Sequence, residues 1–409
     1  MLKHTDVVVI GGGYAGVMAA NRLTSRPDLT VTLVNPRPRF VDRIQLHQHA
    51  VGGLDAELDY AQVLNPRVRL RVGTATRIDA AGRTVALQDG GTLPYDRLIY
   101  AVGSSSAVPQ VPGAAEHALP LAGLEQAQRL RDVLRASPDA PVTVVGAGPT
   151  GIELAAELAE TGRSLTLVCG PLLGPSLHGR GRAAVGQRLA DFGVTVLQGD
   201  GAKAVAVGPD AVTLADGRTV PSGVTVWTAG FGVPDLARRS GLATDAAGRM
   251  LTDETLTSID DPRIVATGDA AAPSGLSYRM SCQAAMQLGP QAAETVLSHL
   301  AGTAPRQVVA AFAGQCLSLG RGSGLFQVSR RDDSVTPLVI PGRAGAALKR
   351  TICAGILREL GVEARRPGVV RWWLRDPARD RRISAARGPA SHGMLGLGER
   401  AAATTSGEL

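Results

Sequence analysis

The chain has 409 residues, of which 44% are hydrophobic and 19% are charged, and this length predicts two or three domains of a globular protein. The formal net charge is +7, and only three of the 43 basic residues are lysines: Lys3, Lys203 and Lys349. No motif of a nucleic-acid-binding module accompanies this charge, so we expect no nucleic acid partner and assign the charge to phosphate cofactors or an anionic membrane surface.

The N-terminal region predicts a β-α-β unit. Residues 6–10 are an apolar, β-branched run typical of a buried parallel strand, residues 17–23 predict a helix, and residues 30–34 predict a second strand. Between the first strand and the helix, residues 11–16 satisfy the pattern G-x-G-x-x-G. In this motif the first glycine permits a tight turn, the second lets the backbone approach a pyrophosphate, and the third lets the helix pack on the strand. The unit therefore predicts a dinucleotide site.

The same order of elements recurs in the middle of the chain. Residues 141–145 predict a strand, residues 146–151 repeat the glycine pattern, residues 152–160 predict a helix, and residues 164–168 predict the next strand. This recurrence is an internal repeat of a nucleotide-binding half. Two copies in matching contexts predict two dinucleotide sites, whereas a single copy would be a weak signal.

Neither unit carries the usual acidic residue at the end of its second strand. In the first unit this position is Asn35, which can hydrogen-bond a ribose hydroxyl without a charge. In the second unit the strand runs into Cys169 and Gly170, and Arg180 and Arg182 follow. An arginine there can accommodate a 2′-phosphate. The choice between NADH and NADPH therefore stays open at this stage.

Between and after the repeats the chain alternates short strands with turns. Residues 97–103 resemble residues 224–230, and residues 109–120 suggest a linker. Residues 264–269 predict a strand that ends in Gly-Asp, and residues 283–300 predict a helix. An aspartate at such a strand end can accept hydrogen bonds from the hydroxyls of a bound cofactor; the alternative is an ordinary turn aspartate.

The character of the chain changes beyond about residue 304. Residues 316–320 and 324–328 suggest a hairpin, and residues 344–360 predict a basic amphipathic helix with Lys349 away from its apolar face. The apolar positions of this helix are Leu348, Ile352, Ile356 and Leu360. The helix either lies on a membrane surface or packs against the first domain or a partner subunit. Residues 376–409 lack periodicity, and we expect most of them to be disordered.

Cysteine spacing and hydropathy exclude several classes of protein. None of the four cysteines forms a C-x-x-C pair, which argues against a redox-active dithiol and against a zinc site, and we expect no metal. No apolar run reaches the roughly 18 residues that a membrane span needs, and no signal peptide precedes the first strand. We therefore expect a cytoplasmic protein, with peripheral contact to the inner face of the cell membrane as the alternative.

Together these motifs resemble the two-dinucleotide-binding-domain flavoproteins, the pyridine nucleotide–disulfide reductase-like superfamily, over about residues 7–300. The absence of a redox thiol and the sequence of residues 281–289 make the chain most similar to the branch of type II NADH dehydrogenases and apoptosis-inducing-factor-like proteins. The resemblance implies an α/β fold with two Rossmann-like domains, the second inserted in the first, and a small C-terminal α+β domain. The implied domains are residues 1–112 with 233–303 for FAD, 113–232 for NAD(P)H, 304–375 for the C-terminal domain, and 376–409 for the tail.

The resemblance also implies the residues that line the two sites. Those implied at FAD are Gly11, Gly13, Tyr14, Ala15, Gly16, Asn35, Arg43, Gln48, Ala75, Gly103, Gly268 and Asp269. Those implied at NADH or NADPH are Gly146, Gly148, Pro149, Thr150 and Gly151. Glu153 would lie beside the nicotinamide and the flavin, the alternative being a surface glutamate at a helix N-terminus. Gln283 and Gln287 would face the electron acceptor, and Cys282 would be either an unusual neighbour of the acceptor or a small buried side chain.

The reaction that the resemblance implies is hydride transfer from NAD(P)H to the flavin, followed by electron transfer to an acceptor, with a quinone favoured. Two alternatives stay open. One is a soluble biosynthetic flavin oxidoreductase or a reductase of a ferredoxin-like carrier, and the other is a nucleotide-sensing flavoprotein without useful turnover. Membrane contact through residues 344–375 and a homodimer are further expectations about partners.

Overall fold

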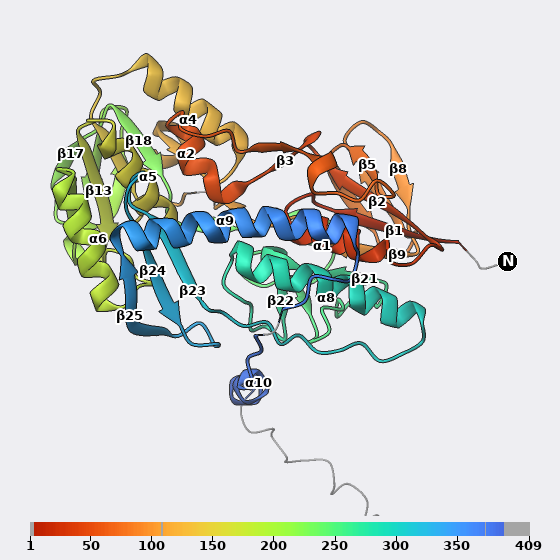
Figure 1. The fold of residues 1–409 in the computed structure, drawn as a ribbon. Helices are drawn as coiled ribbons and strands as arrows, with labels where there is room; N and C mark the ends of the chain where they lie inside the picture. Colours follow the sequence, from red (N-terminus) through yellow and green to blue (C-terminus); the bar gives the residue numbers. More distant parts are fainter. Residues whose placement is uncertain (1–3, 108, 373, 388–409) are drawn as a thin grey trace, which may run out of the picture.

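The first nucleotide-binding half is a five-stranded parallel sheet in the computed structural model, which describes residues 4–107, 109–372 and 374–387 (Figure 1). The strand order is β21-β9-β1-β2-β5, so the last part of the sheet comes from a distant part of the chain. Its strands are β1 (Thr5–Ile10), β2 (Leu29–Asn35), β5 (Arg69–Val72), β9 (Arg97–Tyr100) and β21 (Ile264–Ala266). This arrangement confirms the predicted α/β class.

Helices α1 (Tyr14–Leu23) and α8 (Cys282–Leu300) lie side by side against this sheet. They approach closely because small residues meet at their contact: a Cβ on Gly289 would overlap the backbone oxygen of Ala15. The flanking elements of this half are β3 (Arg39–Val41), α2 (Leu46–Ala50), β4 (Glu57–Asp59), β6 (Ala75–Asp79), β7 (Thr84–Leu87), β8 (Thr92–Pro94), α7 (Leu236–Arg239), β20 (Met250–Thr252) and β22 (Ala271–Pro273).

The second nucleotide-binding half is another five-stranded parallel sheet, with the order β11-β18-β12-β13-β14. Its elements are α3 (Ala114–His117), β11 (Ala118–Pro120), α4 (Leu124–Ala136), β12 (Val142–Val145), α5 (Pro149–Glu160), β13 (Leu165–Gly170), α6 (Gly179–Asp191), β14 (Thr195–Gln198) and β18 (Val224–Trp227). The suggestion of a linker over residues 109–120 is wrong in part, because β11 in this segment pairs with β18. Three short antiparallel strands complete this half: β15 (Ala204–Val207), β16 (Ala211–Leu214) and β17 (Thr219–Pro221).

Two short strands lie where the chain passes between the halves. Strands β10 (Ser105–Ser106) and β19 (Phe231–Gly232) pair antiparallel where the chain leaves the first half and returns to it. The second half is thus inserted between β9 and β21 of the first sheet, as predicted.

The C-terminal part begins with an antiparallel sheet of β23 (Gly314–Ser318), β24 (Gly324–Ser329) and β25 (Val335–Pro341). The first two strands confirm the suggested hairpin. Helix α9 (Gly342–Arg365) follows and runs from this sheet across to α1 (Figure 1). Ile356 and Leu360 on its apolar face are buried in the core of the first half, so the helix packs within the chain.

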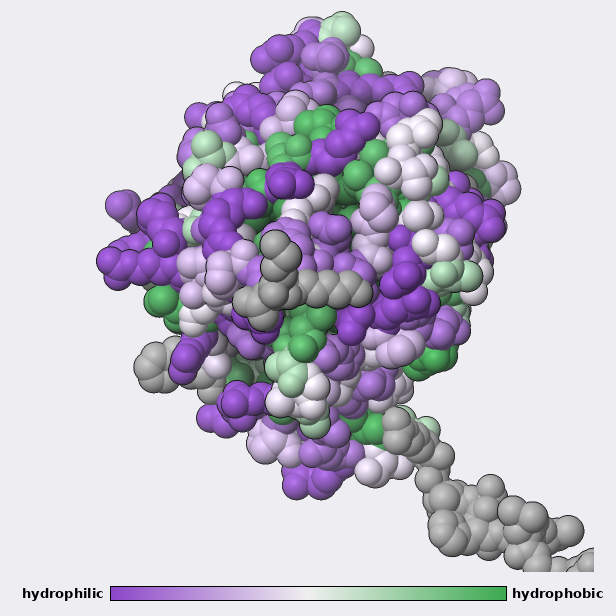
Figure 2. All heavy atoms as spheres, turned by 90° about the vertical axis from the view of Figure 1, so that its right-hand side faces the viewer, coloured by the Kyte–Doolittle hydropathy of each residue, from purple (hydrophilic) through white to green (hydrophobic). Residues whose placement is uncertain are grey.

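The segment after α9 differs from the expected disordered tail. Residues Arg379–Arg387 form helix α10, and Arg379 is buried, where its guanidinium donates to both carboxylate oxygens of Glu254 at 3.1 Å. Trp373 and residues 388–409 lie outside the described residues, so the expected disorder of residues 388–409 stays a prediction. Among the described helices, none is long and apolar enough to cross a bilayer. On the face shown in Figure 2, hydrophobic side chains lie scattered between hydrophilic ones.

Candidate functional site

The first glycine turn has the geometry that its motif predicts. Gly11 has φ +107°, and a Cβ there would overlap the backbone oxygen of Ala101. A Cβ on Gly16 would overlap the backbone oxygen of Gly11, so the helix can close onto the turn only with glycine at this position. In contrast, a Cβ on Gly13 would meet no protein atom within 4 Å. The middle glycine therefore faces open space that a bound group can enter.

The second turn repeats this geometry. Gly146 has φ +116°, a Cβ on Gly151 would overlap the backbone oxygen of Gly146, and a Cβ on Gly148 would again meet nothing within 4 Å. Neither Gly13 nor Gly148 caps its helix with a side chain, so the first amides of α1 and α5 stay available for a phosphate. The two turns fit the pyrophosphates of FAD and of a nicotinamide nucleotide. Tyr14 and Ala15 begin α1, and Pro149 and Thr150 begin α5, at the mouths of these turns.

Asn35 shapes the first turn. Its Oδ1 accepts from the backbone N–H of Gly12 at 3.0 Å, and its Nδ2 donates to the backbone oxygen of Arg37 at 2.9 Å. The backbone oxygen of Asn35 accepts from Gly73 N at 2.9 Å, which sets the start of β6 at Ala75 beside the end of β2. Both ends of the Asn35 side-chain amide therefore have hydrogen-bond partners within the protein.

A chain of hydrogen bonds joins Arg43 to Asp269. The guanidinium of Arg43 donates to Ser104 Oγ at 3.2 Å, and Ser104 Oγ donates to Asp269 Oδ2 at 2.7 Å. Asp269 Oδ1 accepts from the backbone N–H of Ser281, the N-cap of α8, at 3.1 Å. Gly103 packs against Arg43 and has φ +70°. The structure therefore brings these predicted FAD residues together at the start of α8.

Gly268 fits the same corner for a steric reason. It has φ +65°, and a Cβ there would lie 2.9 Å from the Cβ of Ala15. Glycine lets the Gly-Asp segment approach the first turn of α1, which carries Ala15. The first turn and the strand end after β21 therefore form one continuous site.

Glu153 lies in a buried cluster of charged groups. Lys349 Nζ on α9 donates to Glu153 Oε1, Ser318 N donates to the same carboxylate at 2.8 Å, and His47 Nδ1 lies 3.7 Å from Glu153 Oε2. Burial raises the pKa of Glu153, but Lys349, His47 and the Ser318 N–H hold it below its usual range. Burial lowers the pKa of His47 to about 4, so the imidazole is neutral near pH 7. The alternative of an exposed surface glutamate is wrong.

Tyr14, at the start of α1, and Asp42 form a second buried pair beside the first glycine turn. The Tyr14 hydroxyl donates to Asp42 Oδ1. Burial and the neighbouring Asp42 hold the pKa of Tyr14 well above its usual value. Burial also raises the pKa of the Cys282 thiol to about 12, so this thiol is protonated near neutral pH. These properties fit the reading of Cys282 as a neutral, largely buried side chain.

Three predicted glutamines make other contacts than expected. Gln48 Nε2 donates to Glu157 Oε1 on α5 at 3.1 Å. Gln287 donates to the backbone oxygen of Ala311 at 2.8 Å and accepts from the Ala311 N–H at 3.1 Å, which occupies both ends of its amide. The amide of Gln283 can pair in the same way with Ala313 N at 3.1 Å and Gly314 O at 3.2 Å. The contacts of Gln283 and Gln287 tie α8 to the segment that enters β23.

Sequence reasoning missed the partners of Glu153. Lys349 was expected away from the apolar face of its helix, yet its side chain is buried in the middle of the molecule. His47 was not singled out at all. One signal could have pointed to Lys349: in a chain whose basic residues are almost all arginine, this lysine is exceptional.

Comparisons with known proteins agree with this geometry. The family described as pyridine nucleotide-disulphide oxidoreductase matches residues 5–293. A NADH dehydrogenase-like protein of Mycobacterium tuberculosis is 33% identical over 326 residues, which cover 72% of this chain and 81% of that protein. The type II NADH:quinone oxidoreductase Ndh of the same organism is 30% identical, with 75% of each protein covered.

Solved structures of low identity share the fold. The sulfide:quinone oxidoreductase of Aquifex aeolicus superposes with a TM-score of 0.73 at 21% identity and covers 88% of this chain and 92% of its own. NDH2 of Plasmodium falciparum, solved with NADH, gives a TM-score of 0.72 at 14% identity and covers 91% and 99%. At this level of identity the similarity concerns the fold.

Proposed function

This chain belongs to the pyridine nucleotide-disulphide oxidoreductase family, and from that premise we propose that it oxidises NADH and reduces a quinone. It is an FAD-dependent NAD(P)H oxidoreductase. The flavin, when bound, supplies the two-electron chemistry that connects a hydride donor to an electron acceptor. The observation that carries the proposal is the pair of matching glycine turns, each with an open middle glycine, at Gly13 and Gly148.

In this proposal, separate sets of residues bind FAD and the nicotinamide nucleotide. Gly11–Gly16, Arg43, Gly103 and Asp269 hold FAD, and Gly146–Gly151 hold the nucleotide. Glu153 follows the second turn directly, and its carboxylate and the Lys349 ammonium form a buried pair beside the nucleotide site. Reduction of a quinone consumes protons, and we propose that Lys349 Nζ holds a proton and that the Glu153 carboxylate accepts it and passes it on. His47 keeps a neutral imidazole against this pair.

The test is anaerobic reduction followed by an acceptor screen. Purified protein should be yellow, bleach on addition of NADH faster than with NADPH, and regain its colour with a soluble quinone. A protein without bound FAD, or one that NADH does not bleach, contradicts the family assignment of both sites. Faster turnover with a ferredoxin-like protein than with any quinone contradicts the quinone proposal and favours a carrier reductase. Reduction without turnover of any acceptor favours a nucleotide-sensing flavoprotein.

We propose that the outer face of α9 provides contact with an anionic membrane surface. The apolar face of this helix is buried in the protein, so this face cannot insert into a membrane surface. Four exposed arginines recur at steps of seven or eight residues and so share one side of the helix. They are Arg343, Arg350, Arg358 and Arg365. Each basic residue near an anionic bilayer contributes about 1 kcal/mol.

Sedimentation with lipid vesicles tests this contact. The protein should bind vesicles that contain anionic lipid and not neutral vesicles, and added salt should release it. Arg350→Gln with Arg358→Gln should reduce binding, whereas Arg77→Gln with Arg129→Gln removes the same charge from exposed positions elsewhere and should not. Equal loss in both double variants would contradict a role for α9 in particular.

A further inference from the structure

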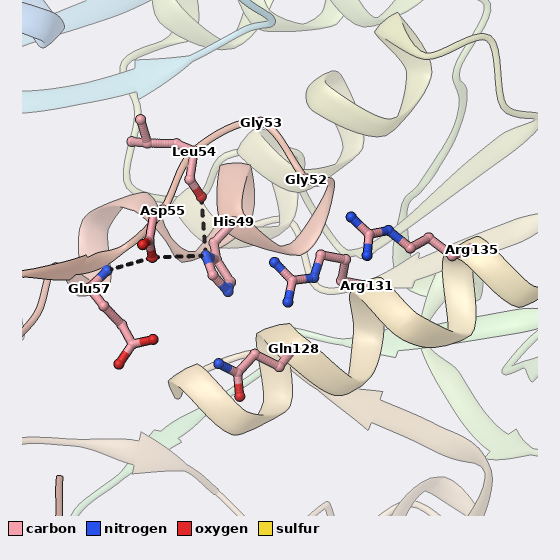
Figure 3. A pocket seen from close by; sticks show the side chains of 9 residues that line it. All are labelled: His49, Gly52, Gly53, Leu54, Asp55, Glu57, Gln128, Arg131 and Arg135. Atoms are coloured by element: carbon pink, nitrogen blue, oxygen red, sulfur yellow. Dashed lines mark hydrogen bonds and ion pairs between the residues drawn. The ribbon is translucent and has the colours of Figure 1, made fainter. Parts of the chain in front are cut away.

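A cavity of about 430 Å³ lies between the loop after α2 and helix α4, apart from the site described above (Figure 3). Its walls are polar, and its volume falls within the range of about 300–1,000 Å³ that small-molecule sites occupy. The residues that define it are His49, Gly52, Gly53, Leu54, Asp55, Glu57, Gln128, Arg131 and Arg135.

His49 is a buried side chain that turns an unused atom toward this cavity. Only 4% of the residue is exposed. Its Nδ1 lies 3.1 Å from the Leu54 backbone oxygen, 3.3 Å from Ala56 N and 3.9 Å from Asp55 Oδ1. In the tautomer in which Nδ1 accepts from the Ala56 N–H, Nε2 carries the ring hydrogen, and within the described residues Nε2 is buried without a partner. A buried donor without a partner costs free energy that a ligand can recover.

Two arginines on α4 face the same space. Arg131 and Arg135 lie one turn apart and extend toward His49 (Figure 3). Arg131 Nε is buried without a hydrogen bond, and within the part of the chain that the structure describes neither guanidinium forms an ion pair with a carboxylate. Arg131 is half-buried and Arg135 is exposed. Two unpaired guanidinium groups beside a free imidazole N–H form a site for a multiply charged anion.

The opposite wall of the cavity is acidic. Asp55 and Glu57 stand across from the arginines, and Asp55 Oδ1 also accepts from the Glu57 N–H at 3.0 Å. Carboxylates are acceptors and repel an anion, so they fit the hydroxyl groups of a ligand whose anionic end lies at the arginines.

The cavity does not belong to the nucleotide site of the second half. Helix α4 ends at Ala136 and β12 starts at Val142, so Arg135 lies near the edge where the parallel strands begin. The glycine turn of Gly146–Gly151 lies at the opposite edge, where they end. The four residues of β12 alone separate these edges by ~13 Å.

We propose that this cavity binds a small organic phosphate that carries hydroxyl groups, such as a sugar phosphate or a nucleoside monophosphate. Its phosphate lies against Arg131, Arg135 and the Nε2–H of His49, and its hydroxyl groups donate to Asp55 and Glu57.

Calorimetric titration of the full, FAD-loaded protein tests the proposal. The probes are glucose 6-phosphate, adenosine monophosphate and inorganic phosphate, each added in the presence of saturating NAD⁺ so that the dinucleotide sites are filled. One organic phosphate should bind at least about tenfold more tightly than inorganic phosphate, because the hydroxyl contacts add roughly 1.4 kcal/mol. Comparison of the two organic probes distinguishes a sugar phosphate from a nucleotide.

Variants on one helix provide the matched control. Arg131→Gln with Arg135→Gln should weaken binding by about tenfold or more, since charge-assisted hydrogen bonds are lost. Arg129→Gln, exposed on the same helix and outside the cavity, should leave it unchanged. All variants should keep the flavin spectrum and melting temperature of the parent. The proposal is overturned if no probe binds at ~10 mM, if inorganic phosphate binds as tightly as both organic probes, or if Arg129→Gln weakens binding as much as the double variant.

Discussion

The ammonium group of Lys349 on α9 donates to the carboxylate of Glu153 on α5, across 196 positions of sequence, and both residues are buried. The pair joins the C-terminal helix to the turn that follows the second glycine motif. Burial alone would lower the pKa of Lys349, but Glu153 holds it above its usual value. The first part of α5 therefore carries a charge that depends on a second charge on α9.

We predict that Lys349→Met destabilises the protein by ~3–5 kcal/mol, because it leaves the Glu153 carboxylate buried without its cation. Urea unfolding of the FAD-loaded protein, followed by fluorescence, measures the change. Glu153→Gln with Lys349→Met should recover much of the loss, since a neutral amide replaces the uncompensated charge. Additive effects of the two substitutions would show that the groups do not interact in solution.

His47 predicts a specific dependence of stability on pH. Burial lowers its pKa from 6.5 to about 4 in the folded protein. Between these values the unfolded chain binds a proton that the folded chain does not, so the free energy of unfolding falls as the pH drops from 6.5 toward 4. The loss from this group approaches ~3 kcal/mol.

The comparison with His47→Asn isolates this contribution. The variant lacks the titrating group, so its free energy of unfolding should fall less steeply than that of the parent below pH 6.5. Above about pH 7 the difference between the two proteins should be constant. Parallel curves throughout the range would mean that His47 titrates normally in the folded state.

The glycine turns were predictable from sequence because their geometry is local. Gly11 and Gly16 meet within a single turn, so spacing alone determines which of them touches the other. The same holds for Gly146 and Gly151. The parallel strands beside them follow from short β-branched runs. Residues 5–293, which the family matches, contain both turns.

The contacts that complete the site were not predictable, because they join distant segments. The pairing of Gln287 with the Ala311 backbone depends on how the segment after α8 folds back. The sequence shows Lys349 only as one more basic residue on an amphipathic helix. Its burial follows from the packing of this helix across α1, which the sequence does not reveal. Arg22, buried in α1, likewise pairs with Glu363 at the far end of α9. Periodicity gives the face of a helix but not the partner that covers it.

Gln287 separates a structural role from a role at the acceptor. Gln287→Leu removes both hydrogen bonds to Ala311 and leaves a buried N–H and a buried carbonyl without partners. We expect a loss of stability of about 2–4 kcal/mol, since each unsatisfied group costs ~1–3 kcal/mol. The KM for a soluble quinone should change little once the folded fraction is taken into account. A large rise in this KM at unchanged stability would support the family-based role at the acceptor instead.

The open middle glycines give the sharpest separation of the two sites. Gly13 has φ −83°, which alanine can adopt, and its Cβ would meet no protein atom. Gly13→Ala should therefore fold normally but bind FAD about tenfold more weakly or worse, because the methyl group occupies the space that the pyrophosphate needs. Gly148→Ala should keep its flavin and instead raise the KM for NADH, since Gly148 has φ −74° and the same open surroundings.

Gly16→Ala is the control for both substitutions. Its methyl group would overlap the Gly11 backbone oxygen, so this variant should lose folded protein as well as flavin. Circular dichroism reports the fold, and the visible absorbance of bound flavin reports the cofactor. If Gly13→Ala and Gly16→Ala lose helical signal to the same degree, the space beside Gly13 serves folding and not the flavin. If Gly148→Ala loses flavin while Gly13→Ala does not, the assignment of FAD to the first turn and NADH to the second is reversed.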